Sequence, residues 1–312
     1  EAMTPITLNY TVNANASSNK VSAGWYHNCA ILDDGDLKCW GRDNHGQLGD
    51  GGSNTNTNAP SSTAIDLGSG RTAIAVSAGD YHTCAILDNG DAKCWGKDSH
   101  GQLGDGGSNT DTTAPSSTAI DLGTGRTAVA VSAGWSHTCA ILDNGDLKCW
   151  GRDNFGQLGD GGSNTDTTAP SSTAIDLGSG RTAIAVSAGD YHTCAILDNG
   201  DAKCWGKDSH GQLGDGGSNT DTTAPSSTAI DLGTGRTAVA VSAGPRHTCA
   251  ILDNGDAKCW GQDSHGQLGD GGTNTDQGSP VSVSGSNTWD ATTTFVTWET
   301  HPALPAGMSI SG

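Results

Sequence analysis

The sequence predicts an all-β protein, a β-propeller of five four-stranded blades, and three observations support this fold class. Ten cysteines recur as pairs with a constant period of 55 residues, starting from Cys29 and Cys39. Each period contains short runs of β-branched and apolar residues separated by Gly, Asp and Asn. Hydrophobic residues make up only 33% of the chain, which holds 47 glycines, so a helical bundle or a doubly wound α/β enzyme is excluded.

The repeated unit explains why a propeller is expected. Four short antiparallel strands cannot bury both of their faces alone, so the copies must stack on one another. Radial stacking gives a β-propeller, for which five blades is within the usual range, and an open solenoid is the alternative. We place the repeats in residues 19–284, with residues 1–18 and 285–312 as terminal strands or linkers. Residues 59–134 are identical to residues 169–244, which indicates the duplication of a two-repeat block.

Within one repeat we expect four strands, which in the second repeat are Thr72–Ala78, His82–Leu87, Asp91–Trp95 and Ala119–Leu122. Between the third and fourth runs lie about 20 residues rich in Gly, Asp, Ser, Asn and Thr, which is long for a structureless loop. We therefore expect turns packed against the blade, with Leu103 as a buried anchor.

The turn chemistry of each repeat predicts a disulfide. In the second repeat, residues 88–90 (Asp-Asn-Gly) fit a three-residue hairpin loop whose glycine adopts the left-handed conformation. This loop places Cys84 directly opposite Cys94, at a Cβ separation of roughly 4.5 to 5.5 Å, and a modest adjustment reaches disulfide geometry. A metal site is disfavoured because no repeat supplies a four-ligand set. The predicted disulfides are Cys29–Cys39, Cys84–Cys94, Cys139–Cys149, Cys194–Cys204 and Cys249–Cys259.

The predicted compartment and partners follow from the disulfides and the charge. Five disulfides place the protein outside the reducing cytosol, and we expect an extracellular or cell-surface location. Glycosylation sequons at Asn9 and Asn15 agree with it. A total of 15 Lys and Arg against 34 Asp and Glu gives a formal net charge of −19, with no basic cluster, which argues against nucleic acid and anionic lipid. No apolar run approaches the roughly 20 residues of a membrane helix. The N-terminus lacks a signal-peptide core, so we interpret the chain as a processed or excised segment.

One long motif recurs in all five repeats and carries a resemblance. It reads Ala-Gly-x-x-His-x-Cys-Ala-Ile-Leu-Asp-x-Gly-Asp-x-Lys-Cys-Trp-Gly-x-Asp-x-x-Gly-Gln-Leu-Gly. This motif resembles the regulator-of-chromosome-condensation repeat family, especially its secreted microbial branch, in which paired cysteines flank the hairpin. The resemblance implies a β-propeller with four-stranded blades. Members of that family include an exchange factor for a small GTPase, a secreted inhibitor of β-lactamase and many bacterial surface proteins, so the fold does not give the function.

The chain differs from the well-known members of that family, which usually have seven blades. Five repeats leave two interpretations, a smaller closed ring or an array that closes only with other segments or subunits. At the C-terminus, residues 303–312 resemble the opening of an immunoglobulin-like domain of microbial surface proteins.

Two sets of histidines recur from repeat to repeat, which favours structural over catalytic roles. The first set, which we expect to bond to backbone within its own blade, is His27, His82, His137, His192 and His247. The second set is His45, His100, His210 and His265. Phe155 takes the corresponding place in the third repeat, a replacement that a planar packing role tolerates and a ligand role does not.

The acidic loop of each repeat offers oxygen ligands of the kind that Ca²⁺ prefers, such as Asp105, Asn109 and Asp111. It lacks the spacing of an EF-hand or of a nonapeptide calcium repeat. We therefore favour a solvated turn, with a weak Ca²⁺ site as the alternative, and expect no other cofactor. No Ser-His-Asp arrangement, phosphate loop or dinucleotide fingerprint is present, so we do not expect an enzyme.

The repeats differ most at the two residues directly before the first histidine. Because each pair follows one strand of its blade, we expect the pairs to form a ring on one face, where Trp, Tyr and Arg are residues that anchor interfaces. The alternative is sequence drift at unconstrained turns. The pairs are Trp25-Tyr26, Asp80-Tyr81, Trp135-Ser136, Asp190-Tyr191 and Pro245-Arg246.

The sequence as a whole favours an extracellular, non-enzymatic binding or structural module of a surface protein, with a protein or glycan partner. A first alternative is a self-assembling filament or surface-layer subunit, in which Ile6–Val12 or Thr293–Trp298 adds to the sheet edge of a neighbouring copy. A second alternative is a secreted inhibitor that blocks an enzyme with its aromatic face.

Overall fold

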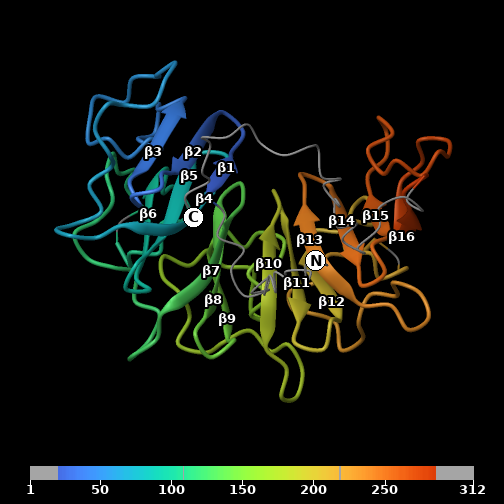
Figure 1. The fold of residues 1–312 in the computed structure, drawn as a ribbon. Helices are drawn as coiled ribbons and strands as arrows, with labels where there is room; N and C mark the ends of the chain where they lie inside the picture. Colours follow the sequence, from blue (N-terminus) through green and yellow to red (C-terminus); the bar gives the residue numbers. More distant parts are fainter. Residues whose placement is uncertain (1–19, 108, 218, 286–312) are drawn as a thin grey trace, which may run out of the picture.

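The computed structural model describes residues 20–107, 109–217 and 219–285, and every helix or strand in this part is a β-strand (Figure 1). The first repeat contains β1 (Val21–Ala23), β2 (His27–Ile31) and β3 (Leu37–Gly41). The second contains β4 (Ala73–Ala78), β5 (His82–Leu87) and β6 (Ala92–Gly96), and the third β7 (Ala128–Ala133), β8 (His137–Leu142) and β9 (Leu147–Gly151). The fourth contains β10 (Ala183–Ala188), β11 (His192–Leu197) and β12 (Ala202–Gly206). The fifth contains β13 (Ala238–Ala243), β14 (His247–Leu252), β15 (Ala257–Gly261) and β16 (Gln277–Ser282).

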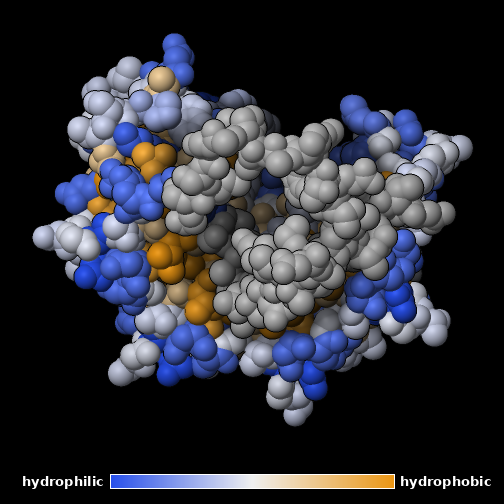
Figure 2. Space-filling model, viewed as in Figure 1, coloured by the Kyte–Doolittle hydropathy of each residue, from blue (hydrophilic) through white to orange (hydrophobic). Residues whose placement is uncertain are grey.

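Each repeat forms one antiparallel sheet whose strands follow one another in chain order. The first strands of successive repeats, β1, β4, β7, β10 and β13, contact one another, so they lie at the centre and the later strands lie toward the rim. Figure 1 shows the five sheets side by side along an arc, and hydrophilic residues cover much of its rim (Figure 2). The predicted all-β propeller architecture is confirmed.

The hairpin register agrees with the turn chemistry. Cys84 faces Cys94, as predicted, and Gly90 adopts a left-handed φ of 82°. All five cysteine pairs form disulfides between residues ten apart, with Cα separations of 4.0 to 4.1 Å. Directly opposed residues at such a short separation form a non-hydrogen-bonded pair. The disulfide therefore joins the two strands at a position where no backbone hydrogen bond does so.

The predicted fourth strand is wrong in the first four repeats. In the second repeat, Ala119–Leu122 is not a strand, and among the described residues of this segment the backbone is hydrogen-bonded to β6 at two places. Thr112 forms an isolated bridge with Gly96, and the Ile120 N–H donates to the carbonyl of Ala92. The segment between these two contacts is longer than the strand it faces, so it cannot run alongside in register. In the fifth repeat a different sequence follows the acidic loop, and β16 pairs with β15.

The hydrophobic core lies between neighbouring blades, not within them. One cluster joins Ile86 and Leu103 of the second repeat to Val131, Leu142 and Trp150 of the third. Leu103 is buried, as expected of the predicted anchor. Because every cluster draws on two repeats, no repeat completes its core alone.

A hydrogen-bond relay also joins each blade to the next, and we call this set of contacts the seam. The Thr138 hydroxyl donates to the carbonyl of Gln102 at 2.8 Å, so the His82 Nε2–H donates to the Thr138 oxygen, also at 2.8 Å. The indole N–H of Trp150 donates to the same Gln102 carbonyl at 3.0 Å. The expectation that the first histidine set bonds to backbone of its own blade is therefore wrong, because the partner is a side chain of the next blade. Burial lowers the pKa of His82 to about 3, so this imidazole is neutral.

Three members of the second histidine set also bridge blades, whereas His265 contacts the adjacent Ser264. His45 Nδ1 lies 2.7 Å from Asp111 Oδ2, and His100 and His210 make the same contact with the next repeat. Phe155 instead packs edge-on against Tyr191, with ring centroids 5.3 Å apart. Phe155 thus keeps the position and the planar shape of the histidine but loses the contact with the carboxylate.

The seams end at the first and fifth repeats. Val21 is 69% exposed, whereas the corresponding Val76 in the second repeat is 1% exposed. The imidazole of His247 makes no bond of the seam type within the described residues, and the first repeat has Asn28 where later repeats have the accepting threonine. The described chain therefore forms four seams and leaves one face of each end repeat uncovered.

Candidate binding site

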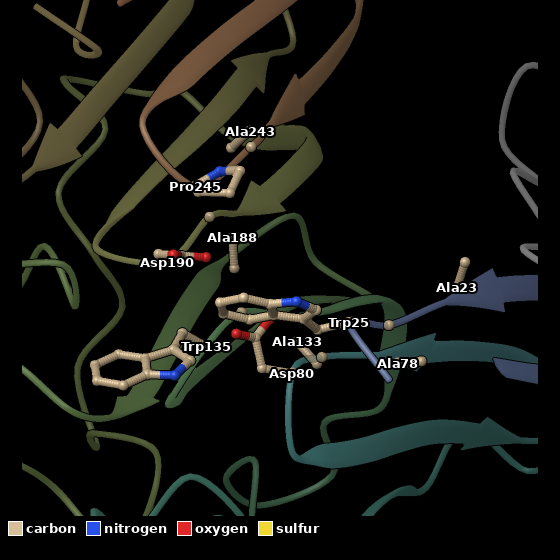
Figure 3. Close-up of a pocket in the computed structure, with 15 residues that line it drawn as sticks. Ala23, Trp25, Ala78, Asp80, Ala133, Trp135, Ala188, Asp190, Ala243 and Pro245 are labelled. Atoms are coloured by element: carbon tan, nitrogen blue, oxygen red, sulfur yellow. The ribbon is translucent and has the colours of Figure 1, made fainter. Parts of the chain in front are cut away.

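The first strands of the five repeats (the inner strands) all end on one side of the arc. Their ends surround a hollow of about 300 Å³ (Figure 3). Each repeat contributes the alanine that ends its inner strand, the following glycine and the first residue of the variable pair. The glycine is required because the repeats approach closely here. A Cβ on Gly79, for example, would collide with the carbonyl of Gly134. The variable lining residues are Trp25, Asp80, Trp135, Asp190 and Pro245.

The variable pairs lie on one face, and several of their rings touch. Trp25 and Tyr26 stack with centroids 5.4 Å apart, and Tyr26 lies 6.3 Å from Tyr81 in the next repeat. Trp135 meets Tyr191 edge-on at 5.0 Å. Among the members of the variable pairs, Ser136 is buried and contributes almost no accessible surface to this face.

Four cations lie over these aromatic rings, and the sequence analysis did not identify them. Arg152 lies 4.6 Å from the ring centroid of Trp135, and Lys207 lies 4.4 Å from that of Phe155. Arg42 and Lys97 make equivalent contacts with tyrosines at 4.9 Å. All four follow the Trp-Gly of the third strand. We call this surface the aromatic–cationic ring; its aromatic members are Trp25, Tyr26, Tyr81, Trp135, Phe155 and Tyr191, and its cations are Arg42, Lys97, Arg152 and Lys207.

A backbone contact within each repeat brings cation and aromatic residue together. The Lys97 N–H donates to the carbonyl of Tyr81 at 2.9 Å, and the Arg152 N–H donates to that of Ser136 at 2.9 Å. The turn that precedes the second strand is thus fixed beside the turn that follows the third. The sequence contains no basic run, yet the fold gathers one cation from each of four repeats on the same face. The one available signal was the Arg or Lys that recurs after Trp-Gly in those repeats.

Two carboxyl groups lie in the hollow itself. Burial, together with the smaller effect of the nearby charge of Asp190, raises the pKa of Asp80 to about 7. Burial also raises the pKa of Asp190, which the Arg246 guanidinium opposes. Oδ2 of Asp80 is buried and has no hydrogen-bond partner among the described residues. Asp80 is therefore partly protonated near neutral pH.

The calcium candidates are occupied by other contacts. Both carboxylate oxygens of Asp111 accept hydrogen bonds, one from the Asp98 N–H and one from His45. Asp105 accepts the N–H of Gly107, and Asn109 turns the chain with a left-handed φ of 55°. Within the described ranges, no group of three or more His, Cys, Asp or Glu side chains is placed to hold a metal ion.

Some predicted features fall outside the described residues. These are the sequons at Asn9 and Asn15, the terminal segments Ile6–Val12 and Thr293–Trp298, and residues 303–312. In the part of the chain that the structure covers, no helix is long and apolar enough to cross a membrane.

Comparison with known proteins gives consistent matches. The family model of the RCC1-like domain matches residues 2–298. The ultraviolet-B receptor UVR8 of Arabidopsis thaliana is 31% identical over 252 residues, which are 81% of this chain and 54% of the receptor. The human E3 ubiquitin-protein ligase HERC2 is 28% identical over 257 residues, 82% of this chain and 5% of the ligase. The chain thus spans about half the length of the first of these relatives and a small part of the second.

Solved structures show the same fold. Human WBSCR16 superposes with a TM-score of 0.72 at 22% identity. The match covers 84% of this chain and 66% of the WBSCR16 chain. Yeast RCC1 (Prp20), crystallised with Kap60, superposes with a TM-score of 0.70 at 18% identity, covering 85% and 63% respectively.

Proposed function

The chain belongs to the RCC1-like domain family, and from this premise we propose that it is a non-enzymatic binding module that holds a protein partner on its aromatic–cationic ring. The observation that carries the proposal is the ring itself, in which cations lie over partly exposed aromatic side chains around a hollow. Trp25 is 57% exposed and Tyr26 is 45% exposed. Large aromatic and arginine side chains are the residues that most often dominate interface energies.

The chemistry of the hollow favours binding over catalysis. Its lining is made of Ala, Gly, Trp, Asp and Pro, so it places no histidine, cysteine, serine or lysine beside the two carboxyl groups. Four histidines of the first set are held in seams, and three of the second set contact an aspartate of the next blade. The repeated histidine motif is therefore accounted for by blade packing.

A protein partner has a precedent in the family, since yeast RCC1 was crystallised bound to Kap60. The compartment is a separate question. Five disulfides point to a non-cytosolic compartment. We extend this to an extracellular or cell-surface location, where the partner would be another exposed protein.

Self-association is the second candidate, and the uncovered end repeats favour it. Val21 exposes 69% of its surface, although its counterpart Val76 is buried in a seam. Light scattering over a range of protein concentrations tests this candidate. A mass that rises with concentration supports it, and a constant monomer mass contradicts it.

A peptide-display selection tests the binding role. A random dodecapeptide library is selected on the wild-type protein, and the enriched peptides are measured against a Trp25→Ala/Trp135→Ala variant with an unchanged melting temperature. We expect the enriched peptides to lose most of their binding to this variant. Enriched peptides that bind both proteins equally would show that the ring is not the binding surface.

A further inference from the structure

We infer that the aromatic–cationic ring selects a partner segment with clustered carboxylates, that is, an acidic peptide. This inference rests on the binding role proposed above and adds the chemical class of the partner. It depends on which cations of the protein are neutralised by its own groups and which are not.

Cations are scarce in this chain, and most of them already have an internal partner. Outside the ring, one arginine in each of four repeats pairs with an aspartate of its own hairpin, as Arg126 does with Asp143 at 3.3 Å. One lysine in each of the first four repeats donates to a backbone carbonyl, as Lys148 does to that of Leu122 at 3.0 Å. The paired arginines are Arg71, Arg126, Arg181 and Arg236.

The ring cations differ from the four paired arginines in having no carboxylate partner, and from the lysines in having no side-chain hydrogen bond to a backbone carbonyl, among the described residues. None of Arg42, Lys97, Arg152 and Lys207 forms a salt bridge to a carboxylate within the described residues, although the chain carries 34 Asp and Glu. Nε of Arg152 is buried and has no hydrogen-bond partner among residues 20–107, 109–217 and 219–285. An acidic protein thus keeps four cations without counter-charges on one face, and an external anion would supply them.

The geometry of each cation suits a carboxylate. An aromatic ring covers one side of the guanidinium of Arg152, at 4.6 Å from Trp135, and this contact orients the group without cancelling its charge. The edge of a guanidinium carries the N–H donors that match both oxygens of a carboxylate. Because Asp80 and Asp190 place negative charge in the hollow, the carboxylates are expected over the cations at its rim and not in its centre.

The charge of the whole protein favours a short acidic segment over a nucleic acid. A formal net charge of −19 repels a duplex, which carries one negative charge per roughly 1.7 Å. A short peptide with a few carboxylates can bind the four ring cations without lying against the rest of the surface, which is negatively charged. Screening lowers such an attraction, so binding should weaken as salt increases.

Fluorescence anisotropy with defined probes tests this inference. The probes are labelled dodecapeptides that alternate glycine with glutamate, with glutamine or with lysine, together with a labelled polyuronate. We expect only the glutamate peptide to bind, with an affinity that falls between about 50 and about 150 mM salt. Binding to the polyuronate instead of the peptide, or a preference for the glutamine or lysine peptide, would overturn the inference.

Matched variants place the binding on the ring. In Arg42→Gln/Arg152→Gln we expect the affinity for the glutamate peptide to drop by about tenfold or more, because two charged contacts are lost. The control Arg71→Gln/Arg126→Gln changes the net charge equally and removes arginines that are already paired, so its affinity should stay within about twofold. Equal losses in both variants would show a general charge effect and overturn the inference.

The two proposals can fail separately. If library peptides depend on Trp25 and Trp135 but are not acidic, the binding role stands and the acidic class is wrong. If no peptide depends on the ring, both are wrong.

Discussion

The seams and the aromatic–cationic ring are built from the same repeats but differ in how their sequences vary. Seam positions keep the same residue, so that His, Gln and Trp recur in every repeat, as at His82, Gln102 and Trp150. Positions of the variable pairs, which supply most of the ring's aromatic residues, change, so that Trp25, Asp80 and Pro245 occupy one equivalent place. In these two regions, then, the positions that join the blades are constant and the positions that surround the hollow vary.

Two tryptophans of the third repeat should show the largest contrast. Trp150 is fully buried in a seam, so Trp150→Ala should lower the free energy of unfolding by about 3 to 5 kcal/mol. Trp135 lines the hollow, and Trp135→Ala should cost about 1 kcal/mol or less. Chemical denaturation monitored by circular dichroism measures both. Equal losses in the two variants would remove the distinction between seam and ring.

Histidine titration sharpens the contrast between a seam and an end of the arc. His137 is fully buried in the third seam, and burial lowers its pKa to about 3. His247 is half-buried at the end of the arc, and its pKa is lowered with an opposing effect from Asp263. Nuclear magnetic resonance of the imidazole carbons should show His247 gaining its proton at a higher pH than His137. Coincident titration curves would contradict the seam geometry.

The relay hydroxyl should have a smaller effect. Thr193 accepts from His137 and donates to the carbonyl of Gln157 at 2.9 Å, so Thr193→Val leaves buried polar groups without a partner. We expect a loss of about 1 to 3 kcal/mol in the free energy of unfolding. The control is Thr118→Val at an exposed turn, which should change stability by less than about 0.5 kcal/mol. If the two variants prove equally stable, the relay contributes nothing.

A separate contrast concerns the pH dependence of Asp80. Its folded pKa is raised to about 7, above the value of 3.8 in the unfolded chain, so its contribution to stability is present at low pH and is lost as the pH rises through 7. Asp80→Asn should therefore gain stability relative to wild type as the pH rises from about 4 to about 8. Thermal melts across this range measure the difference. A constant difference would show that Asp80 ionises normally.

The ionisation of Asp80 should also make the affinity for the glutamate peptide depend on pH. Protonation of Asp80 removes a negative charge near the rim, so the glutamate peptide should bind more tightly just below pH 7 than above it. Asp80→Asn should flatten this dependence, and an unchanged profile in that variant would assign the pH effect to another group.

The sequence predicted the features that depend on neighbouring residues. The turn at residues 88–90 determines the hairpin register, and this register in turn places Cys84 opposite Cys94. The fifty-five-residue period determined the repeats, because a short apolar unit has to stack on its copies. The first inference uses contacts between residues about a dozen positions apart or fewer, and the second uses a strict sequence period.

The features that were missed depend on contacts between distant residues. The partner of His82 is Thr138 in the next blade, and no local pattern distinguishes it from backbone. Lys97 and Tyr81 are separated in the sequence by a whole hairpin, although they are in contact in the fold. The strongly negative net charge of the chain gave no sign that four cations gather on one face. Ala119–Leu122 has the composition of a strand, but the long preceding loop prevents it from pairing in register.

Hydroxyl-radical footprinting with the glutamate peptide bound reports on the ring and the seams in one experiment. We expect the oxidation of Trp25, Tyr26 and Trp135 to fall when the peptide is bound. Trp95 and Trp150, which are fully buried in seams, should stay unreactive with and without it. Protection elsewhere on the surface, with the ring still reactive, would contradict the claim that the aromatic–cationic ring is the binding surface.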